Sequence, residues 1–268
     1  MMGKKTKTRL FNRCGDLDKA WDQLQAWYRT PLGTLVAEAE TALIDRALSD
    51  LFGYYLLQVG RLQDADWLQA SRVSFCEVMD FSPESGSQEK HTGFKGLPFA
   101  LPIQSDSLDV VLLPHVLEFS QQPHAVLREV ERVLIPNGHV VILVFNPLSL
   151  WSFWRWTVGW TRRAPWCGRF MSTTRVKDWM ELLGFDVTHL QGYFFRPPIQ
   201  KTGVMEKLRF SERVGQRLWP ILGASHLIVA KKRVTTLTPI KPRWRPGAKL
   251  VAPGLVEPFQ NKRKHEQQ

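Results

Sequence analysis

Residues that can bind a ligand or move a proton end four predicted strands. Gly60 closes "YYLLQVG", Asp80 lies at the end of "RVSFCEVMDF", His115 follows "LDVVLLP" and Asn146 follows "HVVILVF". Glycine lets the backbone approach a ligand, a carboxylate accepts hydrogen bonds from hydroxyl groups, and a neutral imidazole can accept a proton. The carboxyl ends of parallel strands share one edge of a sheet, where open α/β folds bind their ligands. The sequence therefore predicts a binding site at that edge.

Helices alternate with these strands and would hold them in place. Leucines and alanines recur every four residues in 34–53, and the segments 122–145 and 174–195 each read as helix, turn and strand. A last apolar run, "SHLIVAKK", predicts one more strand. Strands that alternate with helices predict an α/β fold, a doubly wound, Rossmann-like sheet that is mostly parallel and covered on both faces.

The positive charge of the chain is concentrated at its carboxyl end. Of the formal net charge of +11 over 268 residues, the stretch 231–268 carries ten Lys or Arg against two Glu, a net of +8. The remaining body is nearly balanced, which argues against a basic surface that wraps nucleic acid. We divide the chain into an N-terminal extension (1–33), one folded domain (34–233) and a basic, Pro-rich tail (234–268) that we expect to be disordered.

Three cysteines without CxxC spacing, and no histidine cluster, predict neither a disulfide framework nor a metal site. No run approaches the roughly 18 consecutive apolar residues of a membrane span, and no apolar signal segment follows the basic amino terminus. The expectation is a soluble protein of a reducing compartment, the cytoplasm.

The stretch 101–151 resembles the class I S-adenosylmethionine-dependent methyltransferases of the type 11 group. The family's Leu-Pro turn, Ser-x-Asp strand entry and His-x-Leu-Glu element have counterparts here at 101–103, 107–109 and 115–118, and its helix-and-turn motif at 127–138, with Asn137 in place of the first turn glycine. The resemblance covers roughly residues 34–232. It implies a seven-stranded sheet, S-adenosylmethionine as the cofactor, and a transferred methyl group.

The glycine loop of the family is degenerate in this chain. Aligned on Gly60, Gln58 stands at the acidic position, and Leu62 and Asp64 stand where the second and third glycines would be. The carboxylate that holds the ribose falls on Asp80, with Glu77 as the alternative if the strand register differs. The cofactor-binding positions that the resemblance implies are therefore Gln58, Gly60, Asp80, Leu97, Leu113 and Pro114.

The substrate side of the predicted site rests on three residues. His115 is the catalytic candidate, either as a proton acceptor or as a loop histidine that caps backbone groups. Asn146 and Trp151 are candidates for contact with the acceptor, although Asn-Pro is also a common turn. Methyl transfer can proceed by alignment alone, which agrees with the lack of a strong catalytic cluster.

A tryptophan- and arginine-rich segment, 151–170, has two readings. It either packs over the sheet, which we favour, or forms an amphipathic surface for a membrane or a lipid-like substrate. The main functional prediction is a methyltransferase that acts on an unidentified small-molecule or lipid-like acceptor. The alternative is a non-catalytic methyltransferase-like binding or scaffold protein, which the missing glycines favour. The basic tail could contact RNA or an acidic membrane.

Overall fold

A computed structural model of the protein describes residues 17–62, 66–81, 93–158, 163–198, 212, 215, 217 and 219–234, apart from the side chains of 155–158 and 220. The chain divides into two units, Met1–Val234 and Thr235–Gln268. The second unit, and with it the predictions made for the tail, lies outside the described residues.

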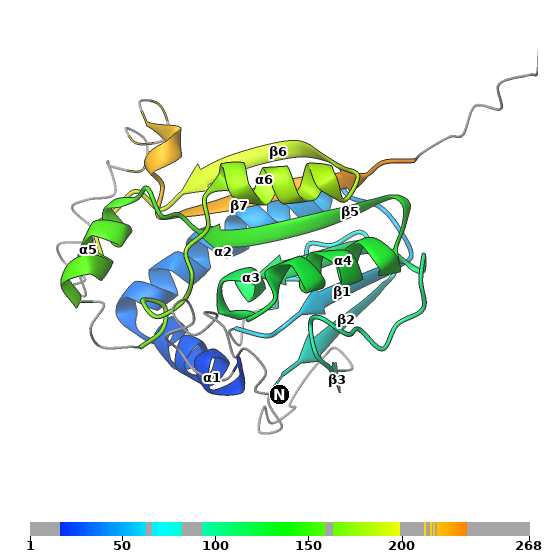
Figure 1. The fold of residues 1–268 in the computed structure, drawn as a ribbon, viewed down its shortest axis with the longest axis horizontal. Helices are drawn as coiled ribbons and strands as arrows, with labels where there is room; N and C mark the ends of the chain where they lie inside the picture. Colours follow the sequence, from blue (N-terminus) through cyan, green and yellow to red (C-terminus); the bar gives the residue numbers. More distant parts are fainter. Residues whose placement is uncertain are drawn as a thin grey trace, which may run out of the picture. The chain divides into compact units, whose positions relative to one another are not determined.

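The first unit is built on one seven-stranded sheet in the order β3-β2-β1-β4-β5-β7-β6. All neighbouring pairs are parallel except those of β7, which runs antiparallel to β5 and β6. This confirms the predicted doubly wound, mostly parallel sheet, and the last strand along the chain, β7, is the antiparallel one (Figure 1). The strands are β1 (Tyr55–Val59), β2 (Phe75–Asp80), β3 (Gly93–Lys95), β4 (Leu108–Pro114), β5 (Leu134–Phe145), β6 (Phe185–Tyr193) and β7 (Ser225–Lys232).

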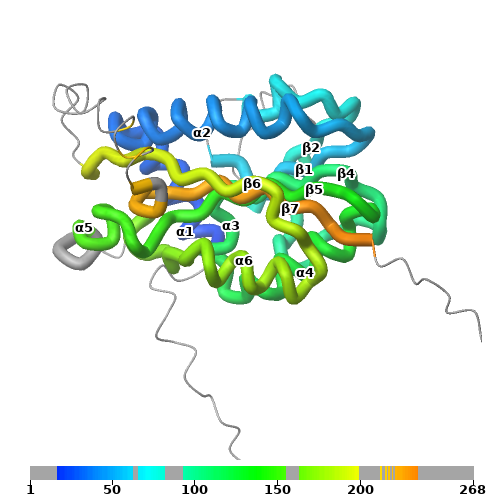
Figure 2. Tube along the Cα trace, turned by 90° about the horizontal axis from the view of Figure 1, so that it is seen from above, coloured from blue at the N-terminus to red at the C-terminus, as the bar shows by residue number. Residues whose placement is uncertain are grey.

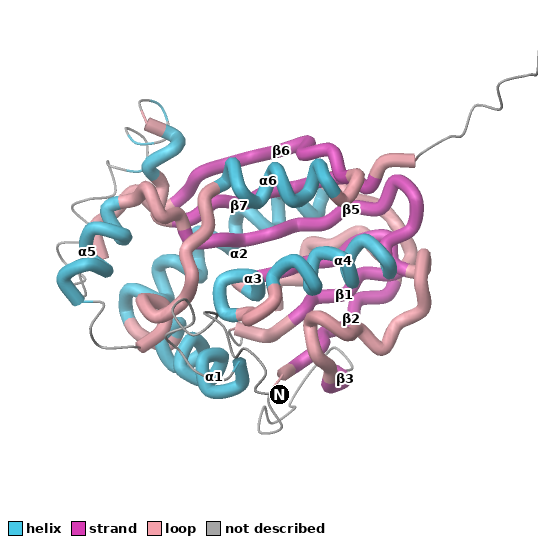
Figure 3. The backbone as a smooth tube through the Cα atoms, viewed as in Figure 1, coloured by secondary structure: helices cyan, strands magenta, loops and turns pink. Residues whose placement is uncertain are grey.

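Helices cover both faces of the sheet. Seen from above, α2 (Pro31–Ser49) lies on one side of it, and α4 (Pro123–Val133) and α6 (Thr173–Leu182) lie on the other (Figure 2). The described part of the chain also contains α1 (Leu17–Tyr28), α3 (Val116–Phe119) and α5 (Leu150–Val158), which Figure 3 labels, and the 3₁₀ turn η3 (Pro220–Leu222).

Local sequence sets the start of α2. Thr30 is its N-cap and accepts a hydrogen bond from the backbone N–H of Gly33, and Pro31 occupies the first turn, where no amide donor is needed. The predicted buried face of this helix is confirmed in part: Leu43 and Leu48 of that face are buried, whereas Leu35, Ala39 and Ala47 are only partly buried. Val36, Glu40 and Ile44, which lie outside the predicted four-residue spacing, are buried as well.

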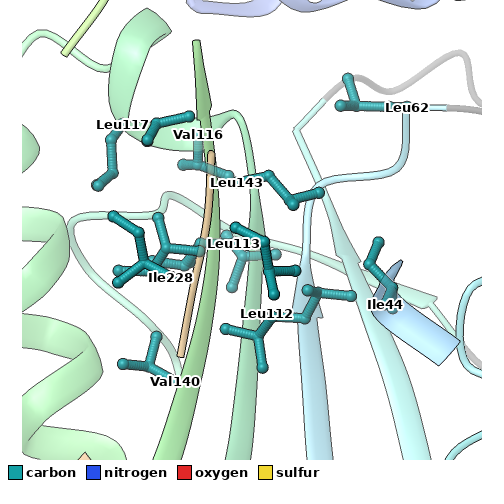
Figure 4. Packing of buried hydrophobic residues seen from close by; sticks show 14 of the residues in the cluster. Ile44, Leu62, Leu112, Leu113, Val116, Leu117, Val140, Leu143 and Ile228 are labelled. Atoms are coloured by element: carbon teal, nitrogen blue, oxygen red, sulfur yellow. The ribbon is translucent and has the colours of Figure 1, made fainter. Parts of the chain in front are cut away.

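The central strands form the core. β4, β7 and the second half of β5 (140–145) are mostly buried, and Figure 4 shows leucines, valines and isoleucines of these strands packed across the sheet. Leu62, just beyond β1, is also part of this core at 1% exposure. The position that the family fills with a second glycine therefore holds an apolar side chain that stabilises the fold.

Helix α1 belongs to the same core, although the sequence analysis placed residues 17–28 in an extension. Ala20, Trp21, Leu24, Trp27 and Tyr28 are all buried. Their spacing of three and four residues gives the helix one apolar face, and that face packs on the sheet domain.

Two further findings concern the predicted compartment. Cys167 is disulfide-bonded and Cys76 is a free thiol, so the expectation that no disulfide forms was wrong; the partner of Cys167 lies outside the described residues. Among the residues that the structure describes, no helix is long and apolar enough to cross a membrane. The cytoplasmic location stays a prediction.

Candidate functional site

The predicted anchors Gly60 and Asp80 lie together at the carboxyl edge of the sheet. The backbone N–H of Gly60 donates to the carbonyl of Met79 at 2.7 Å, which brings the end of β1 beside the end of β2. Gly60 has φ of +86°, in the left-handed region that favours glycine. Both residues thus lie at the strand ends where the sequence placed them, and their role as cofactor anchors stays a prediction.

Helix α1 occupies the space above Gly60. A Cβ atom added to Gly60 would lie 2.4 Å from the indole ring of Trp21 and 2.8 Å from the ring of Phe81, and these two rings contact each other edge to face. The Trp21 indole N–H donates to the carbonyl of Arg61 at 2.9 Å, and the Gln25 amide donates to the same oxygen at 2.7 Å. We call the space above Gly60 the cradle, and the side chain of Trp21 fills it.

The polar anchors of the expected cofactor are engaged within the protein. Gln58 is buried, and its amide donates to the carbonyl of Gly60 at 3.0 Å. The carboxylate of Asp80 lies 3.6 Å from the guanidinium of Arg61. Residues 61–62 and 66–74 contain a turn at 67–70 but no helix, so no helix N-terminus points at this edge within the described part of the connection. In this arrangement the residues do not accommodate S-adenosylmethionine.

The other implied cofactor positions do not converge on this cradle. Leu97 is exposed and pairs only with Ala100 in an isolated bridge after β3. Leu113 and Pro114 are buried inside β4, and Leu113 packs in the central core (Figure 4). The alternative to Asp80, Glu77, lines a cavity of about 500 Å³ at the opposite edge, together with Tyr55 and Phe75.

His115 stands at the centre of a fully buried network of hydrogen bonds. Its Nδ1 lies 2.8 Å from Glu118 and its Nε2 lies 3.0 Å from Glu40. Glu40 also accepts hydrogen bonds from the hydroxyl groups of Tyr28 and Tyr193, each at 2.8 Å, and Glu118 accepts one from the backbone N–H of Phe145 at 2.7 Å. Residues from four separated parts of the chain thus share one polar cluster.

The charge of this cluster follows from its geometry. Burial alone would lower the pKa of His115, but the negative charges of Glu118 and Glu40 and their hydrogen bonds outweigh it and raise the pKa to about 9. Burial, together with the neighbouring Glu40, raises the pKa of the hydroxyls of Tyr28 and Tyr193 well above the ordinary value. At neutral pH His115 is therefore an imidazolium that donates from both nitrogens, an arrangement that suits a structural role better than that of a general base.

The two predicted acceptor contacts also serve the fold. Asn146 donates to the carbonyls of Ile221 and Gly223 at 2.6 and 2.8 Å and accepts from the backbone N–H of Leu148 at 3.0 Å. The indole of Trp151 donates to the carbonyl of Arg196 at 2.9 Å and is buried. Neither side chain faces open space.

Four residues at this edge and in the buried cluster were not predicted from the sequence: Trp21, Tyr28, Glu40 and Tyr193. The pattern in "LDKAWDQLQAWY" could have revealed an apolar helix face, because its apolar residues recur at three- and four-residue spacing. No pattern in the sequence indicated that Glu40 is buried, since a glutamate within a helix is usually exposed to solvent. No group of three or more His, Cys, Asp or Glu side chains suited to a metal ion occurs among the described residues.

Comparison with known proteins points to one family. Residues 60–142 match a family described as a methyltransferase domain. The chain is 30% identical over 212 residues to the uncharacterized protein YafS of Escherichia coli, covering 79% of this chain and 82% of YafS.

Solved structures of low sequence identity share the fold. One is a possible histamine N-methyltransferase from Thermotoga maritima (TM-score 0.56, 17% identity, covering 80% of this chain and 100% of that one). Another contains a putative methyltransferase in complex with the Trm112 activator from Haloferax volcanii (TM-score 0.55, 16% identity, covering 80% and 98%).

Proposed function

Because the chain belongs to the class I S-adenosylmethionine-dependent methyltransferase superfamily, in one family with YafS, we propose that it is itself a methyltransferase. In this proposal S-adenosylmethionine binds at the edge formed by Gly60 and Asp80, and the acceptor is a small molecule or a lipid-like compound. The observation that carries the proposal is the meeting of these two residues, with Gly60 in its left-handed conformation beside the end of β2.

Because the space above Gly60 is filled, the proposed function requires a movement of α1. Trp21 occupies the space above Gly60, so the cofactor can enter only when α1 has moved away. A protein that is competent to bind for only a fraction of the time shows an affinity that is reduced by that fraction. We therefore expect weak apparent binding of S-adenosylmethionine to the native chain.

The same observation favours a second candidate. If α1 never leaves, the chain is a methyltransferase-like binding protein without catalysis. Five buried side chains hold the helix, and burying each large apolar one is worth about 1.5–3 kcal/mol, so opening is costly.

Calorimetric titration with S-adenosylmethionine and S-adenosylhomocysteine separates the two candidates. The variant Trp21→Ala removes the side chain above Gly60 and should bind both compounds at least about tenfold more tightly than the native chain. Trp67→Ala is the matched control, because it also removes a buried indole, but one that donates to Thr41 of α2 and is not among the groups nearest to an added Cβ on Gly60.

Each outcome decides between the candidates. Binding by the native chain, or binding gained by Trp21→Ala and not by Trp67→Ala, supports the methyltransferase. If the folded Trp21→Ala variant binds neither compound, the non-catalytic candidate stands. Parallel titrations with and without reductant account for the disulfide at Cys167.

A further inference from the structure

Helix α5 presents large apolar side chains to solvent. Trp151 is buried, but Leu150, Phe153 and Trp154 are 60%, 68% and 40% exposed, and Leu148 just before the helix is 61% exposed. Positions 150, 153 and 154 lie on one face of a helix. A surface helix of a globular protein normally turns such a face inward, so an outward apolar face requires an explanation.

A second segment adds to this face. In the segment of η3, Trp219, Ile221 and Leu222 are 61%, 63% and 44% exposed. Asn146 ties the two segments together, since it donates to the carbonyl of Ile221 and accepts from the backbone N–H of Leu148. Figures 1 and 2 both place α5 and the orange segment that contains η3 at the same end of the sheet. We call this surface the rim patch: Leu148, Leu150, Phe153, Trp154, Trp219, Ile221 and Leu222.

The chain around the rim patch is strongly cationic. Residues 147–177 contain six Lys or Arg and no Asp or Glu. Three described arginines of these segments, Arg163, Arg175 and Arg217, are exposed. The apolar surface is thus accompanied by positive charge, without acidic side chains in the segment that carries α5.

This composition matches one kind of partner. Tryptophan, phenylalanine and leucine together with arginine are typical of helices that lie in the interface of a membrane, where the apolar face enters the boundary region and cations meet anionic headgroups. Cores of protein–protein interfaces are also enriched in aromatic residues and arginine, so the net positive charge of a segment without acidic side chains is what favours a lipid surface here. The described residues include no helix that could span a bilayer, so the contact would be made at its surface.

We propose that the rim patch docks the protein on an anionic lipid surface, with α5 and η3 seated among the headgroups. The proposal does not depend on methyl transfer, because it rests on exposed side chains and charge alone.

Vesicle flotation with the full chain tests the proposal. Native protein should float with vesicles of phosphatidylcholine and phosphatidylglycerol, and less with phosphatidylcholine alone. The triple variant Leu150→Ser, Phe153→Ser, Ile221→Ser should lose binding by about tenfold or more, because the apolar contribution is removed. All three side chains are at least 60% exposed in the free protein, so the variant should fold normally.

A triple variant at the opposite edge of the sheet provides the matched control. Phe52, Tyr54 and Phe75 are 65%, 70% and 59% exposed, and their replacement by serine should leave vesicle binding unchanged. The proposal fails if the native chain does not float. It also fails if the rim variant floats as well as the native chain, which would assign binding to other basic segments, or if both variants lose binding equally. A native dimer that the rim variant dissociates, without vesicle binding, would identify a self-association surface instead.

Discussion

A buried histidine between two carboxylates governs how the pH affects this fold. The pKa of His115 is raised to about 9 by Glu118 and Glu40 against the effect of burial, whereas an unfolded histidine titrates near 6.5. The folded state therefore binds a proton that the unfolded state releases above pH 6.5. Stability from this group is fully present below that pH and is lost as the pH rises towards 9.

We expect the free energy of unfolding to fall by about 3 kcal/mol between pH 6.5 and 9, as measured by urea denaturation. In NMR spectra the His115 ring should stay protonated at pH 7, with both ring N–H groups protected from solvent. A ring that titrates near its ordinary pKa would contradict the imidazolium assignment.

His226 provides the internal comparison. Burial lowers the pKa of His226 to about 4, and neither of its ring nitrogens has a hydrogen-bond partner among the described residues. Here the unfolded state binds the proton more tightly, so stability falls as the pH drops from 6.5 towards 4. His226→Leu should flatten the acidic limb of the stability profile and leave the alkaline limb unchanged. A change confined to the alkaline limb would show that the two histidines are assigned wrongly.

At the residue scale, the sequence predicted the positions of the candidate residues at strand ends, but not the contacts of their side chains. Gly60, Asp80, His115 and Asn146 all follow strands, because an apolar run shows where a strand ends. What each side chain contacts depends on distant residues. Glu40, 75 positions before His115, determines the protonation of the imidazole, and no local pattern shows such a partner.

At the element scale the main interaction is that of α1 with the turn after β1. A Cβ atom on Gly60 would meet the Trp21 ring, and φ of +86° adds backbone strain for any other residue. Gly60→Ala should therefore destabilise the protein by about 2–4 kcal/mol, through strain and steric overlap together. In a Trp21→Ala background the cost should shrink by at least about 1 kcal/mol, as a double-mutant cycle in urea would measure.

Gly184 offers a matched control for that cycle. Its φ is +82°, but nothing lies within 4 Å of an added Cβ. Gly184→Ala should cost only the strain of the backbone, about 1–2 kcal/mol, and should show no coupling to Trp21→Ala. If the two glycines behave alike in both backgrounds, Trp21 does not pack on Gly60 in solution.

Helices with strong periodicity were predicted from the sequence. Helix α1, which changes the interpretation of the Gly60 edge, was not predicted. α4 and α6 were evident from helical spacing and a following turn. The segment of α1 was read as polar because charged and amide residues alternate with its tryptophans. Its role became apparent only when the strands placed Gly60 beneath it, because the contact joins residues about 40 positions apart.

At the scale of the whole molecule, the alternation of strands and helices and the family resemblance predicted a mostly parallel, seven-stranded sheet, but not the order of its strands. That order determines which parts can open separately. β5 pairs with β4 on one side and β7 on the other, and its residues 140–145 are fully buried. Its amides should therefore exchange with solvent only when the domain unfolds, whereas β3, a three-residue edge strand, should exchange through local opening.

The exchange of α1 amides relative to those of β5 tests how the molecule is organised. If α1 is a separable cover over the Gly60 edge, its amides should exchange at a lower opening free energy than those of β5, and addition of S-adenosylhomocysteine should speed their exchange by favouring the open form. If α1 is a permanent part of the core, both sets should exchange together and the ligand should have no effect. Native-state hydrogen exchange with increasing denaturant distinguishes these cases. Joint exchange of α1 and β5 would remove the condition on which the proposed methyltransferase function depends, because Trp21 would then never leave the cradle without unfolding the sheet.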